Sequence, residues 1–309
     1  MKLLGGDVGG TKTLLRCVDE NGATLFEQRY ESASYRSFDD LVRDFLSQNE
    51  GEIDAACFAV AGPVYGARAE ITNVGWVIEE AALTRTFPIG RVSLINDFYA
   101  IALGVPLLDD RDLVSLQEGE RDTSAPIAIL GAGTGLGQAI VTRHGSMHHV
   151  ISSEGGHADF APQDGEQARL FLYLHETYGH VSWERVASGM GLVNIFTFLG
   201  GDEISAAEIA ERADAGDARA QHAFAIFVDV YGAEAGNMAL RVLARGGVYL
   251  AGGIAAKNKD RFTDGRFMNA FTRKGRFHDL VRSIPVDLIV NEEVGLIGAV
   301  EGAARAAGG

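Results

Sequence analysis

Cysteine is scarce in this chain of 309 residues, which contains only Cys17 and Cys57. Each lies inside an apolar segment, where a cysteine ordinarily serves as a small buried hydrophobic residue. Two thiols cannot complete a tetrahedral all-cysteine zinc site. We therefore expect a reduced, cytoplasmic protein without a structural metal.

Positive charge is also in short supply. The chain has 27 Lys and Arg against 42 Asp and Glu, a formal net charge of −15, and the basic residues form no cluster. A partner that presents a phosphate backbone needs a concentrated basic face, so the composition argues against nucleic acid. Any phosphate that the protein binds must be held largely by backbone N–H groups and a metal ion.

Long apolar runs and Pro-rich linkers are missing as well. No stretch approaches the roughly 18 apolar residues that a membrane span requires, and Met1-Lys2 leads straight into a strand-like segment rather than a signal peptide. A chain of this length can bury roughly three-quarters of its unfolded surface, enough for one large or two medium domains. We expect no membrane association.

The N-terminal third reads as strands followed by an amphipathic helix. Asn21-Gly22 predicts a hairpin turn, and apolar residues at helical spacing from Phe38, preceded by Ser37, predict a capped helix. Residues around Thr72-Asn73 and Trp76 are expected to form a loop. The other elements expected here are strands at 2–7, 13–19, 23–31, 54–61 and 92–97 and a short helix near 79–87.

The remainder of the chain alternates strands with helices. The longest expected helix runs from 218 to 243 and stops at Gly246-Gly247. Ser205 with Glu208 resembles a capping box. The other expected elements are strands at 127–130, 138–142, 248–251 and 285–290, and helices at 164–178, from about 182, and at 295–306. This alternation predicts an α/β fold.

Two glycine-rich turns, at 5–11 and 131–137, each join consecutive predicted strands. The first fails the Walker A pattern because Thr11 separates the last glycine from Lys12. The second fails the dinucleotide pattern because Leu136 and Gln138 stand where the third glycine is required. Such turns suit an anion cradled by main-chain amides, although a purely structural role is equally open for either turn alone.

Between these turns, Asn96-Asp97 ends a short apolar run that begins at Val92. A carboxylate at a strand end near phosphate-type loops suggests a general base close to a nucleotide. The alternative is that Asp97 only caps the helix that follows it.

Six motifs occur in order along the chain: GDVGGT (Gly6–Thr11), INDF (Ile95–Phe98), GAGTGLG (Gly131–Gly137), EGGHADFAP (Glu154–Pro162), ERVASGMGL (Glu184–Leu192) and AGGI (Ala251–Ile254). In these motifs, essentially the whole chain resembles the bacterial glucokinases of the hexokinase type, within the superfamily of actin, the heat-shock chaperone ATPases and the sugar kinases. Lys12 departs from the Asn usual in glucokinases and is common in the related repressor–kinase family. That family usually carries a cysteine-rich zinc motif, which is missing here.

The resemblance implies ATP-dependent phosphorylation of glucose at the 6-hydroxyl, with Asp97 as the general base and Asn96 binding a neighbouring hydroxyl. Asp7 would hold Mg²⁺ through water. The remaining implied sugar ligands are Glu154, His157 and Glu184. The residues implied to face the nucleotide are Gly9, Gly10, Thr11, Gly133, Thr134, Gly135, Gly252 and Gly253.

By the same resemblance, we expect a two-domain actin-like, ribonuclease-H-like ATPase fold with a cleft between its domains. The smaller α/β domain would comprise residues 1–107 plus 290–309, and the larger one 108–289. We also expect a cytoplasmic homodimer that acts in glycolysis.

Each assignment has a simpler structural alternative. His157 alone would be an ordinary core or surface histidine, Glu184 would favour a helix dipole, and Gly252-Gly253 would be a strand-to-helix turn. Other activities also remain: a non-catalytic sugar sensor, a kinase for another hexose, an actin-like or chaperone ATPase, and an NAD-dependent enzyme.

Overall fold

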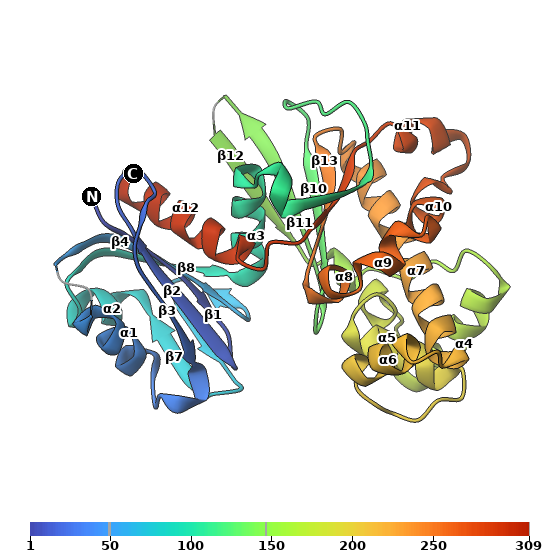
Figure 1. The fold of residues 1–309 in the computed structure, drawn as a ribbon, viewed down its shortest axis with the longest axis horizontal. Helices are drawn as coiled ribbons and strands as arrows, with labels where there is room; N and C mark the ends of the chain where they lie inside the picture. The colour runs from blue at the N-terminus through green and yellow to red at the C-terminus, as the bar shows by residue number, and fades with distance from the viewer. Residues whose placement is uncertain (49–50, 146, 309) are drawn as a thin grey trace. The chain divides into compact units, whose positions relative to one another are not determined.

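The chain divides into two units, each built around its own β-sheet (Figure 1). The computed structural model describes residues 1–48, 51–145 and 147–308. Unit 1 comprises Met1–Leu108 and Glu293–Gly309, and unit 2 comprises Asp109–Glu292.

The main sheet of unit 1 has the strand order β3-β2-β1-β4-β8. β1 is antiparallel to β2 and parallel to β4, and β4 is parallel to β8. Val8 pairs with Val60, which pairs with Asn96, so the parallel strands end together at one edge of the sheet. The strands are β1 (Leu3–Val8), β2 (Lys12–Val18), β3 (Thr24–Glu31), β4 (Ile53–Val60) and β8 (Ile89–Asn96).

Helices cover both faces of this sheet. On one face, large apolar side chains of α1 and the strands form a core around Phe38, Phe58 and Trp76. On the other face, α3 and α12 pack against each other and against the strands. The helices of unit 1 are α1 (Phe38–Ser47), α2 (Glu80–Thr86), α3 (Asp97–Gly104) and α12 (Val294–Gly308), with 3-10 turns η1 (Ser32–Ser34) and η2 (Val105–Leu107).

Glycine permits the close crossing of α3 and α12. A Cβ atom added to Gly298 would lie 1.7 Å from the carbonyl oxygen of Ala100, and one added to Gly104 would lie 2.3 Å from that of Val294. No real Cβ atom approaches backbone so closely, so only glycine fits at these two positions. The crossing holds the first turns of both helices beside the edge of the sheet where β1 and β8 end.

The sheet of unit 2 has the strand order β12-β11-β10-β13-β14-β9. Its first five strands repeat the pattern of unit 1: β12, β11 and β10 are successively antiparallel, and β10, β13 and β14 are parallel. The strands are β9 (Leu113–Gln117), β10 (Ile127–Ala132), β11 (Leu136–His144), β12 (Met147–Ser153), β13 (Gly247–Ala251) and β14 (Val286–Ile289).

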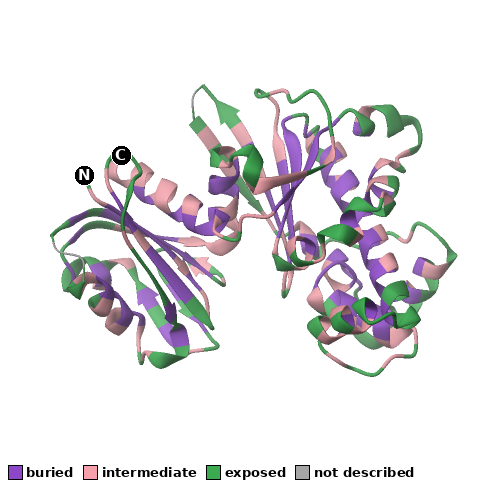
Figure 2. Cartoon of the chain, in the orientation of Figure 1, coloured by how far each residue is buried: buried purple, intermediate pink, exposed green. Residues whose placement is uncertain are grey.

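The helices of unit 2 surround the long helix α7, which is buried along most of its length (Figure 2). Tyr231 of α7 makes edge-to-face contacts with Phe262 and Phe267, whose rings are tilted against each other. The helices are α4 (Gly165–Tyr178), α5 (Gly189–Phe198), α6 (Ala206–Asp214), α7 (Ala218–Val242), α8 (Gly253–Lys257), α9 (Lys259–Thr263), α10 (Arg266–Thr272) and α11 (His278–Arg282). The 3-10 turns are η3 (Asp110–Asp112), η4 (Gly155–His157), η5 (Trp183–Arg185) and η6 (Gly275–Phe277).

The structure corrects three expectations. The expected loop around Trp76 is a small antiparallel sheet of β5 (Val64–Tyr65), β6 (Arg68–Ile71) and β7 (Trp76–Glu79). The segment after Ser182 is a 3-10 turn, and the α-helix begins only at Gly189, capped by Ser188. Helix α7 ends at Val242 because Leu243 takes a left-handed conformation (φ 48°), before the glycines at 246 and 247.

Other local predictions are confirmed. Ser37 caps α1 by accepting the Asp40 N–H at 3.1 Å, and Ser205 caps α6 by accepting the Glu208 N–H at 3.1 Å. Cys17 and Cys57 are both fully buried. None of the described helices combines the length and the apolarity that crossing a bilayer requires.

Candidate functional site

The first glycine turn, between β1 and β2, is shaped by a buried serine. Gly9 N–H donates to the carbonyl of Lys12 at 3.0 Å, and the Ser32 hydroxyl donates to the carbonyl of Gly9 at 2.7 Å. Ser32 N–H in turn donates to the carbonyl of Thr11 at 2.9 Å. A Cβ atom on Gly10 would lie 2.9 Å from that of Asn73. The turn is therefore fixed in shape without help from a ligand.

Asp7 lies beneath this turn, in the last part of β1. Burial and the nearby charge of Asp97 raise its pKa to about 6, against a smaller lowering by Arg29. The first turn of α12 lies alongside, because a Cβ atom on Gly295 would be 3.8 Å from Asp7 Oδ2. Unit 1 thus holds two carboxylates close together at one sheet edge.

Asn96 and Asp97 have different structural roles at the start of α3. The cap is Asn96, whose Oδ1 accepts from Phe98 N–H at 2.9 Å and from Tyr99 N–H at 3.3 Å. Its Nδ2 donates to the carbonyl of Gly62 at 3.0 Å. Asp97 is the first helical residue, and its Oδ1 accepts from Phe98 N–H at 2.8 Å. Burial raises the pKa of Asp97, against the hydrogen bonds from Phe98 and Asn96, which lower it. Asp97 is therefore not the capping residue.

The second glycine turn, between β10 and β11, is held by the segment that begins at Glu184. Leu136 N–H donates to Glu184 Oε2 at 3.0 Å, and Gly189 N–H donates to the carbonyl of Gly133 at 2.8 Å. Within the turn, Gly133 N–H donates to the carbonyl of Gly135 at 2.9 Å. Both ends of the turn are thus tied to one segment of unit 2.

Gly252 lies against the start of the same turn. Its φ angle is +89°, a conformation that side chains rarely adopt, and a Cβ atom there would lie 2.4 Å from the carbonyl oxygen of Ala132. Gly253 then begins α8 and is exposed. These contacts place the Gly252-Gly253 motif next to the second glycine turn, as one would expect of two parts of a single nucleotide site.

Glu154, His157 and Glu184 come together in unit 2. His157 Nδ1 lies 3.9 Å from Glu184 Oε1, and His157 Nε2 lies 3.9 Å from Glu154 Oε2. These separations exceed a direct hydrogen bond. The side chain of Glu154 is 94% exposed, that of His157 61% and that of Glu184 19%. The cluster therefore offers acceptors and a donor to something outside the protein.

Three residues that the sequence did not single out contact these motifs. Ser32 and Asn73 contact the first glycine turn, as described above. Gln138, buried on β11, packs against the EGGH segment: a Cβ atom on Gly155 would lie 2.1 Å from Gln138 Oε1. A polar residue among the apolar residues of a predicted strand was the only available signal for Gln138. No sequence signal marked Ser32 and Asn73, because their contacts with the motifs form only when the chain folds.

Among the described residues, no group of three or more His, Cys, Asp and Glu side chains could hold a metal ion by itself. Mg²⁺ does not need such a cage, since it is commonly bound by one or two carboxylates together with substrate phosphates and waters. Asp7, with Asp97 beside it and a glycine turn above it, has the oxygen donors that fit such an ion.

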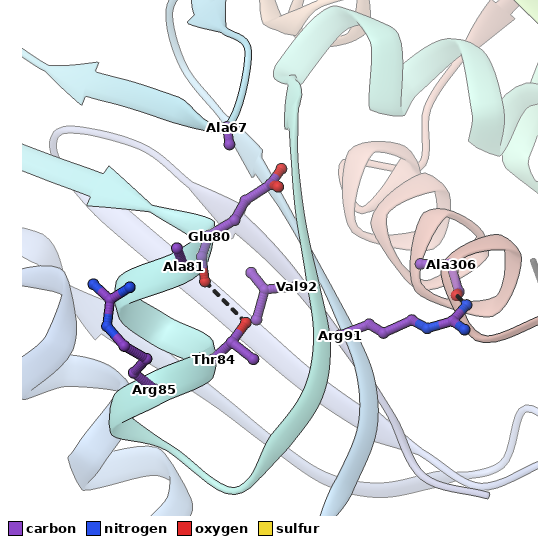
Figure 3. A pocket seen from close by; sticks show the side chains of 8 residues that line it. All are labelled: Ala67, Glu80, Ala81, Thr84, Arg85, Arg91, Val92 and Ala306. Carbon is purple, nitrogen blue, oxygen red and sulfur yellow. Dashed lines mark hydrogen bonds between the residues drawn. The ribbon is translucent and has the colours of Figure 1, made fainter.

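A separate hollow of unit 1, of about 580 Å³, contains none of the predicted residues (Figure 3). It lies between α2, β8 and the end of α12. Its two guanidinium groups do not converge: Arg91 points toward α12 and donates to the carbonyl of Ala306 at 2.7 Å, whereas Arg85 points away. The hollow therefore does not form an anion site.

Comparison with known proteins shows which family this chain belongs to. The family model described as Glucokinase matches residues 4–306. A glucokinase of Nostoc sp. (strain PCC 7120) is 39% identical over 338 aligned residues, which cover 98% of this chain and 99% of the relative.

Solved structures agree. The crystal structure of a glucokinase from an Antarctic psychrotroph is similar with a TM-score of 0.90 and 30% identity, covering 98% of this chain and 99% of the other. The fold is also that of a Balamuthia mandrillaris glucokinase crystallised in complex with glucose, with a TM-score of 0.81 and 23% identity over 98% of this chain and 93% of the other.

Proposed function

The chain belongs to the glucokinase family, and from that premise we propose how its residues carry out the ATP-dependent phosphorylation of glucose. The resemblance to bacterial glucokinases and the actin-like ATPase fold, both predicted from the motifs, are confirmed. The reaction transfers the terminal phosphoryl group of ATP to the 6-hydroxyl of glucose and yields glucose 6-phosphate and ADP.

Asp97 is the general base. Its Oδ1 is held by Phe98 N–H, so Oδ2 is the oxygen that receives the proton of the 6-hydroxyl as the new O–P bond forms. Burial raises the pKa of this carboxyl, which makes it a stronger base than an exposed aspartate. This partly buried carboxylate at the strand end, fixed by the helix it begins, is the observation that carries the proposal.

Asn96 binds the sugar beside the reacting hydroxyl. Its Oδ1 is engaged in capping α3, and one N–H of its Nδ2 points to Gly62. A primary amide has two N–H donors, and we assign the second one, which bonds the Asp97 carboxylate, to a sugar hydroxyl when glucose binds. Because capping fixes the amide group, Asn96 can orient the sugar without first losing conformational freedom.

Glu154, His157 and Glu184 bind the other hydroxyls. The gaps of 3.9 Å on either side of His157 suit a hydroxyl group that bridges a ring nitrogen and a carboxylate oxygen. A hydrogen bond to a charged carboxylate is among the stronger ones in proteins. A sugar that lacks one of these hydroxyls would leave a polar side chain without its partner, which disfavours its binding.

The glycine turns hold the nucleotide. Gly9, Gly10 and Thr11 face the terminal phosphates, and Asp7 is the residue that would hold Mg²⁺, through water. The ion neutralises phosphate charge when it is bound, which is its main contribution in phosphoryl transfer. The second phosphate loop is Gly133, Thr134 and Gly135, and the adenosine side is formed by Gly252 and Gly253.

We assign unit 1 as the smaller and unit 2 as the larger catalytic domain, in a cytoplasmic homodimer that acts in glycolysis. Expectations of a homodimer and a cytoplasmic location come from the family alone.

The direct test replaces Asp97 by Asn. This variant should lose roughly 10²–10⁴-fold in kcat, the usual contribution of general base catalysis. Glucose binding, measured by calorimetry without nucleotide, should persist. Asp39→Asn, which removes an acid from the first turn of α1, is the matched control and should retain full activity. Near-wild-type kcat in a folded Asp97→Asn protein would show that another group is the base.

A coupled assay with glucose, fructose, mannose and no sugar completes the test. Turnover with glucose distinguishes a glucose kinase from a sensor that binds without turnover and from an ATPase that needs no sugar. Faster turnover with another hexose would correct the substrate.

A further inference from the structure

The two carboxylate oxygens of Glu184 face two different loops of unit 2. Oε2 accepts the N–H of Leu136, the residue that ends the second glycine turn, at 3.0 Å. Oε1 faces His157 Nδ1 of the EGGH segment at 3.9 Å. A carboxylate is planar and rigid, so one oxygen cannot move without the other. Whatever ligand engages Oε1 therefore acts on the residue that anchors the glycine turn.

The contact with the glycine turn is tight. A Cβ atom on Gly135 would lie 2.5 Å from Glu184 Oε2, closer than real Cβ atoms ever come. A Cβ atom on Gly133, in the same turn, would have nothing within 4 Å. The Ser188 hydroxyl also donates to the backbone carbonyl of Glu184 at 2.7 Å, which fixes the residue at its main chain.

We propose that Glu184 couples hexose binding to the second phosphate loop, so that sugar held at Oε1 strengthens nucleotide binding by the turn at 133–135. The inference rests on the proposed function, in which Glu184 is a sugar ligand. Its physical basis is pre-ordering: a hydroxyl on Oε1 stops rotation of the carboxylate and so keeps Oε2 on the Leu136 N–H. A nucleotide that binds afterwards then loses less conformational entropy in ordering the turn.

Coupling between two sites is reciprocal, so a change in the glycine turn must also alter sugar affinity. This gives a test in which no nucleotide is present. Gly135→Ala pushes Glu184 away from its position, and we expect it to weaken glucose binding, measured by calorimetry, by roughly 5–150-fold, the usual range of such couplings. Gly165→Ala, at the exposed start of α4, where an added Cβ atom would meet only Arg169 Nη1 at 3.8 Å, is the matched control, and it should leave the glucose Kd unchanged.

Neither glycine has a positive φ angle, so both substitutions keep a normal backbone conformation. Thermal unfolding without ligand identifies any variant that fails to fold. If Gly135→Ala misfolds, the measurements on Glu184 described next decide the question alone. An unchanged glucose Kd in a folded Gly135→Ala protein overturns the proposal.

The second test measures the coupling itself. The Kd of a non-hydrolysable ATP analogue with Mg²⁺ is determined with and without saturating glucose. Wild-type protein should bind the analogue more tightly with glucose, and Glu184→Gln should reduce this ratio toward one, because an amide offers only one acceptor oxygen. Glu154→Gln should weaken glucose binding yet keep the ratio at saturating glucose, because the Glu154 side chain is 94% exposed, whereas Glu184 is the residue that accepts the Leu136 N–H.

The outcomes distinguish the role of Glu184 as a sugar ligand from the proposed coupling. If Glu184→Gln binds glucose as the wild type does, the assignment of Glu184 as a sugar ligand is wrong, and the coupling falls with it. If Glu184→Gln weakens glucose binding but keeps the wild-type ratio, the sugar assignment stands and the coupling is refuted. A wild-type ratio of one also refutes it.

Discussion

Asp7 lies beside Asp97 in unit 1, and the charge of Asp97 adds to burial in raising the pKa of Asp7 to about 6. The sheet produces this pairing. Asp7 pairs with Ala59 of β4, Ala59 pairs with Ile95 of β8, and Asp97 follows two residues later. Two carboxylates so close repel each other when both are ionised, which destabilises the folded protein. A bound cation would reduce this repulsion.

The first prediction concerns stability and pH. Between the ordinary value of 3.8 and about 6, folded protein keeps a proton on Asp7 that unfolded protein has released. The free energy of unfolding therefore falls as pH rises through this window. Asp7→Asn removes the effect, so above pH 6 the variant should be more stable than wild type by about 1–3 kcal/mol.

Urea unfolding between pH 4 and 8, without nucleotide or metal, checks this. The difference between Asp7→Asn and wild type should grow with pH and vanish near pH 4. Parallel stability curves for the two proteins across the whole range would contradict the prediction.

The second prediction separates the two roles of Asn96. Asn96→Ala should destabilise the protein by about 1 kcal/mol, because α3 loses its cap, and should raise the KM for glucose. Asn96→Ser restores a capping oxygen but not the amide donor, so it should recover stability and keep the high KM. Ser37→Ala, which removes the cap of α1, is the control for lost capping alone.

Chemical unfolding and steady-state kinetics on these variants give the answer. If Asn96→Ser recovered both stability and KM, Asn96 would be a cap and nothing more. Ser37→Ala should lose stability with no change in KM.

The third prediction concerns Glu154, whose side chain is 94% exposed. Glu154→Gln should raise the KM for glucose by roughly 10–100-fold, the worth of a charge-assisted hydrogen bond. Stability and the KM for ATP should not change, because the carboxylate is almost fully exposed and His157 Nε2, at 3.9 Å, is too far away for a direct hydrogen bond. Glu176→Gln, on the exposed face of α4, is the control. An equal rise in both KM values would point to disturbed structure instead.

The fourth prediction concerns Glu234, which is fully buried on α7. Its carboxylate accepts hydrogen bonds from Gln138 Nε2 at 2.9 Å, Asn237 Nδ2 at 3.0 Å and Arg241 Nη1 at 2.6 Å. Glu234→Ala leaves the buried amide of Gln138 without its acceptor, whereas Arg241 is 46% exposed and can turn to water, so the change should cost about 1–3 kcal/mol.

Denaturant unfolding at neutral pH measures the loss. Glu176→Ala serves as the exposed control and should change stability by less than about 0.5 kcal/mol. A loss for Glu234→Ala no larger than the control's would mean that water or neighbouring groups replace the carboxylate.

Local signals made much of the fold predictable. The apolar spacing from Phe38 and the cap at Ser37 lie within one segment, so the sequence alone defines α1. The small sheet was missed although Ala69 and Ile71 alternate with exposed neighbours, because strands this short are stabilised only by partners. The end of α7 was predicted to within one residue, but the glycines at 246 and 247 are not what ends it, because Leu243 takes the left-handed conformation that usually belongs to glycine.

The candidate site was predictable only as a set of motifs. Glu184 and Leu136 are separated by 48 residues, and nothing in either local sequence shows that they touch. The division of roles at α3 was also hidden, because Asn and Asp are equally good caps and the choice depends on backbone geometry.

The shared strand order of the two sheets has a consequence for how such a chain can change in length. Each half keeps a turn of the same size between its central antiparallel strands, at 9–11 and at 133–135. The halves differ at the connections farther from these turns: the one after the outermost strand holds η1 and α1 between β3 and β4 but α4 to α7 between β12 and β13. Added length at this connection leaves both turns intact, so an engineered insertion has its best chance of being tolerated there.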